Sequence, residues 1–359
     1  MSKSTQDFVN ADKEPALKNN LKRRLTAAAL CLCAIFTTSA VLADEPKAWP
    51  EEKRIRLVVP FPAGGGADTL ARIIAPELSK VLNQTVYIDN RAGAGGSLGT
   101  ATALKDKADG YTLIYVTNGT MGTNAALYPR LGYDVAKDFA PVARLTDIAL
   151  AMVVNPERIK AKSLNEFLVL AQKAQHPMTF ASSGNGTTSH LAGVLLAQQT
   201  ELPFEHIAYP GGAAAMTDVL AGRVDFMIDV APNAMPQVQS QKLIALGVTS
   251  AARVDRFANV PTLNEAGVKG YELFAWDGIV VKAGTDKLIV EKLNAAIQTV
   301  LKTPAVAEAL EARGAQPQTS TPESFAQFIA QEHVKCADKL RACVRPLQQR
   351  GSCTDRGGA

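Results

Sequence analysis

Four glycine-rich loops, each directly after a run of apolar and β-branched residues, limit most strongly what this chain can fold into. They are PAGGGAD (62–68), RAGAGGSLG (91–99), SSGNGTTSH (182–190) and YPGGAAA (209–215). Helical patterns, such as those at 70–82 and 163–175, alternate with the strand-like runs. This alternation predicts an α/β fold in which helices pack around mostly parallel sheets.

Nine apolar runs are the predicted strands of this fold. They read IRLVVPF, VYIDN, YTLIYVT, IALAMVVN, MTFASSG, FEHIAY, VDFMIDV, LIALGVTS and YELFAWDGIVV.

A few residues predict where the helices begin and bend. Ser163 and Glu166 have the spacing of a capping box, so a helix is expected to start there. Thr285 and Thr321 are expected to be N-caps of two later helices. Pro76 is expected to kink the helix at 70–82, because proline has no N–H to donate within a helix.

The N-terminus has the pattern of a secretory signal. Lys22, Arg23 and Arg24 precede the apolar run LTAAALCLCAIF, and Val41-Leu42-Ala43 follows as a small-residue cleavage site. Residues 1–43 are therefore predicted to be an N-terminal extension and a signal peptide cleaved after Ala43. A permanent membrane anchor is the weaker alternative, since a span needs about 20 apolar residues. The polar residues 2–20 favour Leu21 as the true start.

Charge and cysteine content exclude several classes of protein. The net charge is +4, and residues 1–43 carry six Lys/Arg and three Asp/Glu, which leaves +1 for the exported part. Nothing in that part indicates a nucleic-acid partner, which requires clustered basic charge. No cysteine occurs between 44 and 335, so the body is neither a disulfide scaffold nor a thiolate metal site.

The glycine loops do not match nucleotide-binding motifs. In the pattern G-x-G-x-x-G, the third glycine is replaced by Thr69, Leu98 or Ser189 in the three loops that begin it. None of the loops contains the G-K-[ST] sequence of a phosphate-binding loop. We therefore predict no nucleotide cofactor.

One catalytic pattern is present and gives an alternative function, a secreted serine hydrolase. Gly95-Gly96-Ser97-Leu98-Gly99 matches G-x-S-x-G, with His190 and His206 downstream as candidate bases. However, RAGAG separates Ser97 from the preceding strand, whereas a nucleophile elbow follows its strand directly. The chain contains no H-x-x-x-H or H-E-x-x-H pattern, so no metal site is predicted.

The loops share uncharged hydrogen-bond donors, namely backbone N–H groups, serine and threonine hydroxyls and the amide of Asn185. Such donors suit a carboxylate, which accepts several N–H bonds without needing a full counter-charge. Because ligands of α/β sheets bind at the carboxyl ends of strands, the four loops predict one shared cleft.

Several longer segments resemble one known family. They include PFPAGGGADTLAR, NRAGAGGSLGT, DGYTLIYVTNGT, SSGNGTTSHLAG, HIAYPGGAAAMTDVLAGRVDFMID and YELFAWDGIVVKAGT, in this order from Lys53 to about Glu332. This combination is similar to the extracytoplasmic solute receptors of tripartite tricarboxylate transporters, also called Bug receptors.

The resemblance implies a two-lobed periplasmic binding protein of type II topology, which is not an enzyme. Lobe 1 is expected to comprise 44–144 plus 271–335, and lobe 2 to comprise 145–270, with crossings near Leu145 and Tyr271. A monomer in the periplasm would bind a small carboxylated solute and deliver it to membrane permease subunits. Docking on a histidine kinase, as a ligand sensor, is a second possible role.

Ligand contacts are carried over from the family residue by residue. For Asp68, a ligand contact and a carboxylate that favours a helix start are equally good explanations. For Asp229, a strand-end hydrogen-bond anchor is slightly favoured over a contact to a ligand amine or to cleft water. The expected contacts are Phe61, Ala63, Gly64, Gly65, Asp68, Gly95, Gly96 and Ser97 in lobe 1, with Ser183, Gly184, Asn185, Gly186, Thr187 and Asp229 in lobe 2.

The C-terminus departs from the family. Residues 336–359 form an atypical basic segment with Cys336, Cys343 and Cys353, in place of the short closing segment that family members carry. We predict that this segment is disordered and that its removal leaves the melting temperature nearly unchanged.

Overall fold

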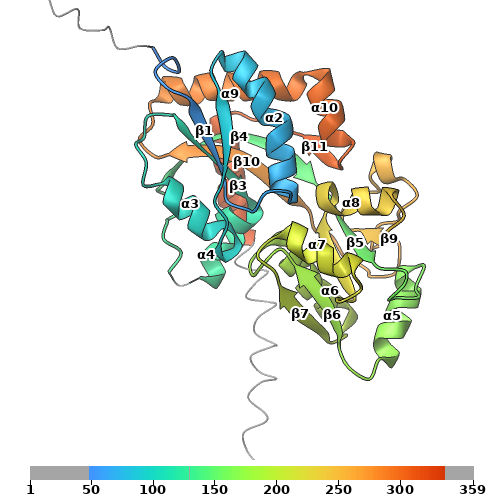
Figure 1. Ribbon diagram of the computed structural model, residues 1–359. Helices are drawn as coiled ribbons and strands as arrows, with labels where there is room; N and C mark the ends of the chain where they lie inside the picture. Colours follow the sequence, from blue (N-terminus) through green and yellow to red (C-terminus); the bar gives the residue numbers. More distant parts are fainter. Residues whose placement is uncertain (1–47, 129, 336–359) are drawn as a thin grey trace, which may run out of the picture. The chain divides into compact units, whose positions relative to one another are not determined.

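The structure is a computed structural model that describes residues 48–128 and 130–335 (Figure 1). The predicted signal peptide (1–43) and the cysteine-containing tail (336–359) lie outside the described residues. Within them, strands and helices alternate along the chain and form two separate sheets.

The first sheet has six strands in the order β11-β4-β10-β3-β1-β2. β1 pairs in parallel with β2 and β3, whereas β10 pairs antiparallel with β3 and β4, and β11 antiparallel with β4. The strands are β1 (Ile55–Val59), β2 (Val86–Asn90), β3 (Thr112–Thr117), β4 (Phe139–Ile148), β10 (Ala275–Lys282) and β11 (Ala315–Pro317).

The first sheet and the helices packed with it form the first half of the structure, and these helices come from both ends of the described chain. α9 contacts β4, α2 and α10, which brings the C-terminal helices onto elements formed early in the sequence. The helical elements are α2 (Gly66–Leu82), η1 (Ala94–Gly96), α3 (Ser97–Ala103), η2 (Gly119–Thr123), α4 (Asn124–Leu127), α9 (Lys287–Lys302) and α10 (Pro304–Glu311), followed by a helix at 322–335.

The second sheet has five strands in the order β7-β6-β8-β5-β9. β6 pairs in parallel with β7 and β8, and β5 pairs antiparallel with β8 and β9. Its elements are β5 (Leu150–Val154), α5 (Leu164–Lys173), β6 (Met178–Ser182), α6 (Thr188–Thr200), β7 (Phe204–Ala208), α7 (Gly212–Leu220), β8 (Phe226–Val230), α8 (Ala231–Gln239), β9 (Ile244–Val248) and η3 (Asp255–Phe257).

The chain passes between the sheets twice. Ala149 alone separates β4 from β5, and residues 249–274 lead from β9 back to β10. The sheets are therefore mixed, and the prediction of mostly parallel sheets was wrong. The reason is geometric. β5 and β10 each enter a sheet from the end at which the neighbouring strands β8 and β3 finish, so each runs antiparallel to that neighbour.

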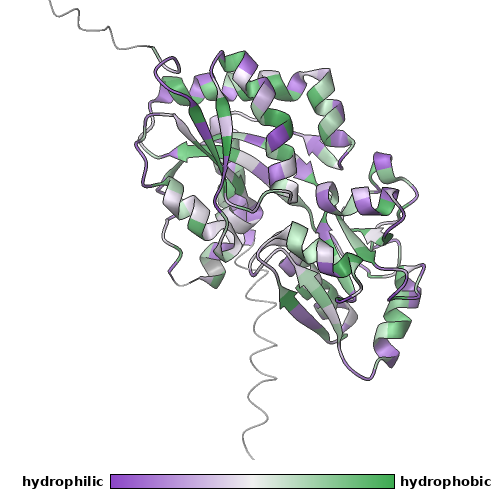
Figure 2. Ribbon diagram, viewed as in Figure 1, coloured by the Kyte–Doolittle hydropathy of each residue, from purple (hydrophilic) through white to green (hydrophobic). Residues whose placement is uncertain are grey.

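Buried apolar residues hold both sheets together. All five residues of β5 (LAMVV) are buried, and seven of the eight residues of β10 are buried. Figure 2 shows hydrophobic residues along the strands, whereas α5 and α9 carry hydrophilic residues on part of their surface. Alternation of this kind on a helix is typical of one face packed on a core and the other in water.

The helix boundaries confirm some predictions and correct others. The Ser163 hydroxyl accepts a hydrogen bond from Glu166 N at 3.3 Å, so the predicted capping residue of α5 is confirmed. Thr321 likewise accepts from Ser324 N at 3.2 Å. Thr285 is not the N-cap of α9; Asp286 is, because its carboxylate accepts from Leu288 N. α2 begins four residues earlier than predicted and continues through Pro76.

Candidate functional site

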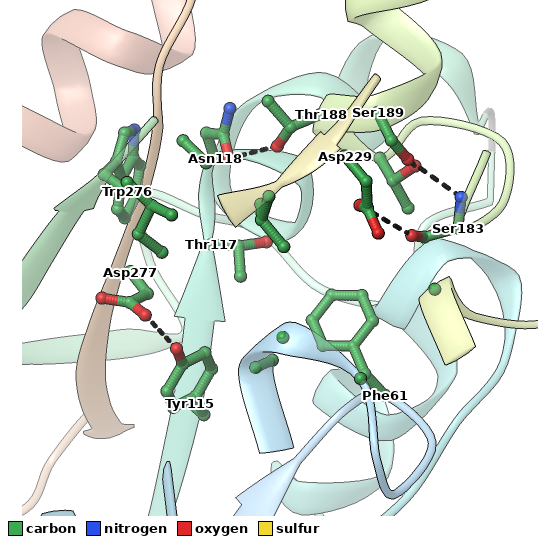
Figure 3. A pocket seen from close by; sticks show the side chains of 18 of the residues that line it. Phe61, Tyr115, Thr117, Asn118, Ser183, Thr188, Ser189, Asp229, Trp276 and Asp277 are labelled. Atoms are coloured by element: carbon green, nitrogen blue, oxygen red, sulfur yellow. Dashed lines mark hydrogen bonds between the residues drawn. The ribbon is translucent and has the colours of Figure 1, made fainter. Parts of the chain in front are cut away.

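A pocket opens where strands of both sheets end. β1, β3, β6 and β8 run toward it, and the residues that follow them form its walls (Figure 3). The space between the walls, including the part open to solvent, is about 680 Å³. The lining residues are Phe61, Pro62, Gly65, Gly66, Ala67, Tyr115, Thr117, Asn118, Ile148, Ser183, Thr187, Thr188, Ser189, Gly212, Asp229, Val230, Ala275, Trp276 and Asp277.

Four helices begin at this pocket. The N-cap residues of α2, α6, α7 and α8 make no side-chain hydrogen bond to their helices. Among the helices that begin elsewhere, α5 and α9 are capped by the side chains of Ser163 and Asp286, whereas α3 and α10 have no side-chain cap. The starts of α2, α6 and α7 present N–H groups and the positive end of the helix dipole, which together form an anion-binding site. At the start of α8, Ala231 N donates to the Ala149 carbonyl and Pro232 has no N–H, so α8 contributes mainly its dipole.

The loop after β1 contributes only part of its predicted contacts to the pocket. Phe61 and Gly65 line it, as do Gly66 and Ala67, which the sequence did not single out. Ala63 and Gly64 are exposed and do not line it. The close fit of this loop requires glycine, since a Cβ on Gly66 would lie 2.5 Å from Val230 Cγ2.

Asp68 supports this loop from behind and does not line the pocket. Its carboxylate accepts hydrogen bonds from Gly64 N (2.9 Å), Arg72 Nε (2.8 Å) and Asn90 Nδ2 (3.0 Å). Burial acts to raise the pKa of Asp68, but these three donors outweigh it and lower the pKa below the ordinary value. Asp68 thus ties the glycine loop to α2 and to the end of β2.

Gly95, Gly96 and Ser97 lie in the loop and helix start that follow β2, and Gly95 is next to the loop after β6. Gly95 has φ +60°, and a Cβ there would lie 2.4 Å from the carbonyl oxygen of Asn185. Ser97 starts α3, and its hydroxyl accepts a hydrogen bond from Asn124 Nδ2 at 2.8 Å. These three residues do not line the pocket.

The loop after β6 divides in the same way. Ser183 and Thr187 line the pocket, whereas Gly184, Asn185 and Gly186 do not. The Asn185 carbonyl accepts a hydrogen bond from the Tyr128 hydroxyl at 3.2 Å. Hydroxyls fix the loop from within: Ser183 N donates to Ser189 Oγ at 2.9 Å, and Thr187 Oγ1 donates to the Gly184 carbonyl at 2.7 Å.

One side-chain hydrogen bond crosses the pocket between the two halves. Thr188 Oγ1, at the start of α6, donates to Asn118 Oδ1, at the end of β3, over 2.7 Å (Figure 3). Both residues are buried.

Two buried carboxylates face the pocket. Asp229, at the end of β8, accepts from the Ser183 hydroxyl at 3.4 Å and from the Asn233 amide. Asp277, in β10, accepts from Thr146 N (3.0 Å), Thr146 Oγ1 (2.6 Å) and the Tyr115 hydroxyl. Burial raises the pKa of each carboxyl to about 6, against the lowering effect of these hydrogen bonds.

The sequence missed several lining residues, although most lie in segments that carry the family resemblance. Thr117 and Asn118 end the run YTLIYVTN, and their position directly after a strand was an available signal. Asp277 interrupts the apolar run YELFAWDGIVV, and a lone acid in a buried strand is a signal of a special environment. Tyr115 and Trp276 were the other polar or aromatic residues missed, whereas Thr188 and Ser189 were among the hydroxyl donors predicted for the third loop but not among the expected ligand contacts.

The histidines have partners other than Ser97. His206 Nε2 lies 2.6 Å from Ser182 Oγ, and its ring stacks on that of His190. His190 Nδ1 accepts from Gly186 N at 3.3 Å, which is a packing and loop-fixing role rather than that of a base for Ser97.

Two negative findings apply to residues 48–128 and 130–335. In these ranges, no helix has the length and apolarity needed to cross a membrane. The same ranges contain no cluster of three or more His, Cys, Asp or Glu side chains that could hold a metal ion.

Two α/β lobes, two chain crossings and a pocket at the strand ends define a two-lobed periplasmic binding protein of type II topology. The chain belongs to the family described as "Tripartite tricarboxylate transporter family receptor", which matches residues 70–342. Members of this family are solute-binding receptors and not enzymes, so the hydrolase alternative for Ser97 is excluded.

Relatives of known sequence match over nearly their full length. A UPF0065 protein in the tcbD-tcbE intergenic region of Pseudomonas sp. is 35% identical over 90% of this chain and 95% of its own. Protein BugT of Bordetella pertussis is 33% identical over 90% of this chain and 98% of its own.

Solved structures show the same fold. A structure of an R. palustris protein with adipate has a TM-score of 0.80 at 31% identity and covers 82% of this chain and 98% of its own. The periplasmic binding protein BugD has a TM-score of 0.78 at 31% identity, with 81% and 98% covered. MatC from Rhodopseudomonas palustris with bound malate has a TM-score of 0.76 at 32% identity, with 80% and 99% covered.

Proposed function

We propose that this chain is a periplasmic receptor that binds a small carboxylated molecule between its lobes and delivers it to the permease subunits of a tripartite transporter. The observation that carries the proposal is the meeting of four helix starts without side-chain caps at one pocket, which no Lys, Arg or His of the described residues lines. A carboxylate is the small anion that such N–H donors hold without a full counter-charge.

The strength of such binding comes from several modest contributions. Each helix start favours a negative charge by about 0.3–1 kcal/mol, and by up to about 2 kcal/mol in a partly buried site. The Thr117 hydroxyl adds a donor to the same space, whereas the hydroxyls of Ser183, Thr187 and Thr188 already donate their protons to Asp229, Gly184 and Asn118. Phe61 and Trp276 add apolar surface against the carbon chain of a ligand.

Two related structures support the choice of ligand class. One R. palustris protein was solved with adipate and MatC with malate, and both compounds are small carboxylates. We extend to this chain only the class of ligand, since its own pocket side chains decide which acid it takes.

The predicted site residues fall into three proposed roles. Phe61, Gly65, Ser183, Thr187 and Asp229 line the pocket and are proposed to contact the ligand. Ala63, Gly64 and Asp68 are proposed to position the first loop. The proposed rim residues, which meet when the lobes close on the ligand, are Gly95, Gly96, Ser97, Gly184, Asn185 and Gly186.

We further propose export through a signal peptide cleaved after Ala43 and action as a monomer. The lobes are proposed as 44–144 plus 271–335 and 145–270. Leu145 lies inside β4, four residues before the passage to the second sheet at Ala149.

Melting-temperature shifts test the ligand class. The purified chain is heated alone and with each member of a panel of mono-, di- and tricarboxylates, all at the same concentration. An acid present at 100 times its dissociation constant adds about 2.7 kcal/mol, so the best acids are expected to raise the melting temperature by about 5–10 °C.

The primary amides of the same acids are the matched controls, because they keep the shape and remove the negative charge. Equal shifts for acids and amides, or no shift with any acid, would contradict the proposed function.

A further inference from the structure

Within residues 48–128 and 130–335, the charged groups that line the pocket are all acidic. Asp229 and Asp277 are both at least 98% buried, and no Lys, Arg or His of these ranges lines the pocket. A site that takes a carboxylate therefore places two carboxylates of its own against the ligand. This arrangement needs an explanation, since like charges at short range repel.

Asp277 is held on both oxygens by the protein. Thr146 donates its N–H and its hydroxyl to Oδ1, and the Tyr115 hydroxyl donates to Oδ2. These donors join β10 to β4 and β3, so Asp277 fastens the strands beside the pocket. Its capacity to accept is largely used.

Asp229 is held less completely. The Asn233 amide donates to Oδ2 and the backbone N–H of Val230 also donates to the carboxylate, but the contact of Oδ1 with the Ser183 hydroxyl is 3.4 Å, at the outer limit of a hydrogen bond. None of these partners carries a positive charge, and no ion pair of the described residues involves Asp229. Figure 3 shows its carboxylate beside Ser183, on the wall opposite Asp277.

A buried carboxylate without a cationic partner is costly. In agreement, burial raises the pKa of Asp229 to about 6, which means that the environment disfavours the charged form. A positive group placed next to Asp229 would remove this penalty, and the ligand is the available source of one.

The charges around the pocket are nearly balanced. The four helix starts contribute about half a positive charge each, or roughly +2 together. Asp229 and Asp277 contribute −2 when ionised. A ligand with no net charge, whose negative and positive ends face opposite partners, preserves this balance better than a dianion does.

We propose that the pocket takes a carboxylate that also carries a protonated amine, with the carboxylate held by the helix starts and the ammonium hydrogen-bonded to Asp229. This inference rests on the proposed function, because it names the ligand class of the same site. According to this inference, Asp229 determines which of several acids of similar size binds.

Calorimetric titration with matched pairs tests the inference. The purified chain is titrated with aspartate and succinate, with glutamate and glutarate, and with γ-aminobutyrate and butyrate. Within each pair that binds, the amine-bearing member is expected to bind at least about tenfold tighter, which is about 1.4 kcal/mol.

The isosteric variant Asp229→Asn is titrated with the same pairs, and Glu157→Gln is its control, because Glu157 is an exposed acid with 90% of its side chain accessible. The preference for the amine is expected to fall below about threefold in D229N and to persist in E157Q. Equal or tighter binding of the amine-free members by the unaltered chain, or an undiminished preference in D229N, overturns the inference and leaves the proposed function intact.

A further titration keeps the test decisive if D229N does not fold. N-acetylaspartate retains both carboxylates of aspartate and has no ammonium, so the unaltered chain is expected to bind it at least about tenfold more weakly than aspartate. Affinity equal to that of aspartate overturns the inference. If no acid binds, with or without an amine, the proposed function fails and the inference fails with it.

Discussion

Thr188 Oγ1 donates a hydrogen bond to Asn118 Oδ1 over 2.7 Å, and this bond joins the start of α6 in the second sheet's half to the end of β3 in the first. Both residues line the pocket. Because the partners come from different halves of the chain, the bond exists only while the halves are together. A substitution that removes this hydrogen bond therefore tests whether it helps to keep the ligand enclosed.

Removal of this hydroxyl should weaken binding by speeding release. Thr188→Val keeps the shape of the side chain, and a lost hydrogen bond of about 0.5–1.5 kcal/mol corresponds to a roughly twofold to tenfold weaker affinity. We expect the change in the dissociation rate constant, measured by stopped-flow fluorescence. Thr200→Val is the control on the same helix, since Thr200 bonds only within α6, to the Leu196 carbonyl. Equal effects of the two variants would contradict this role.

A methyl group on Gly95 should block closure of the rim. The added Cβ would lie 2.4 Å from the Asn185 carbonyl oxygen, so the halves could not approach as closely. We expect Gly95→Ala to lower the affinity for a carboxylate at least tenfold, measured by calorimetry, with about 1–2 kcal/mol of backbone strain at φ +60°.

Gly270→Ala separates these two effects. Gly270 has φ +73°, and no atom lies within 4 Å of the position that its Cβ would occupy, so this variant carries similar strain without the clash. Unchanged affinity in G270A together with weak binding in G95A is the expected result, and equal affinities in the two variants would refute the proposed rim contact.

Asp277 should make the unliganded chain more stable in mild acid. Its folded-state pKa of about 6 lies above the ordinary value of 3.8, so between these pH values the folded chain binds more protons than the unfolded chain. The stability from this group is fully present below pH 3.8 and is lost as the pH rises through about 6. The difference is on the order of 3 kcal/mol.

Urea unfolding from pH 4 to pH 7 measures this dependence. Asp277→Asn has no such titration, so its free energy of unfolding is expected to vary less over this range. A D277N variant with the same pH dependence as the unaltered chain would show that Asp277 is not the group responsible.

Asp68 should act in the opposite direction. Its pKa is lowered by its donors, so its contribution is present above pH 3.8 and is lost as the pH falls through the lowered folded-state pKa. Asp68→Asn is expected to lose about 1–3 kcal/mol at pH 7, because the bonds to Gly64 and Arg72 are to a charged acceptor. The loss in free energy of unfolding, measured by urea unfolding, should become smaller toward pH 3. A loss that is the same at all pH values would show that the negative charge of Asp68 is not its cause.

The sequence predicted most strands well but not their directions. VYIDN coincides with β2, and YTLIYVT is one residue longer than β3. The run IALAMVVN was read as one strand, whereas Ile148 ends β4 and Leu150 begins β5 in the other sheet. A passage between sheets needs no turn residue when the chain continues almost straight, so the local sequence carries no signal for it.

β4 itself was missed for a related reason. Its sequence FAPVARLTDI contains Pro141, Arg144 and Asp147, which break an apolar pattern. In the fold these polar residues have partners, since Arg144 pairs with Asp147 and its guanidinium lies 3.8 Å from the centre of the Phe328 ring. Pairing between distant segments is tertiary information that periodicity cannot supply.

The candidate site was predicted by loop but only partly by residue. Each predicted loop supplies the pocket or its rim, because strand-end position can be read from the sequence. Which residue of a loop points inward depends on contacts with the other half, as with Gly95 against Asn185. Asp277 was missed because it comes from the middle of a strand, where site residues were not sought.

The central claim is that helix starts hold the carboxylate of the ligand, and a crystal structure with the tightest-binding acid of the panel tests it most directly. We predict carboxylate oxygens within about 3.2 Å of backbone N–H groups at the starts of α2 and of α6 or α7. An acid bound instead among the basic side chains Lys53, Arg54 and Arg56, away from these helix starts, would contradict the account.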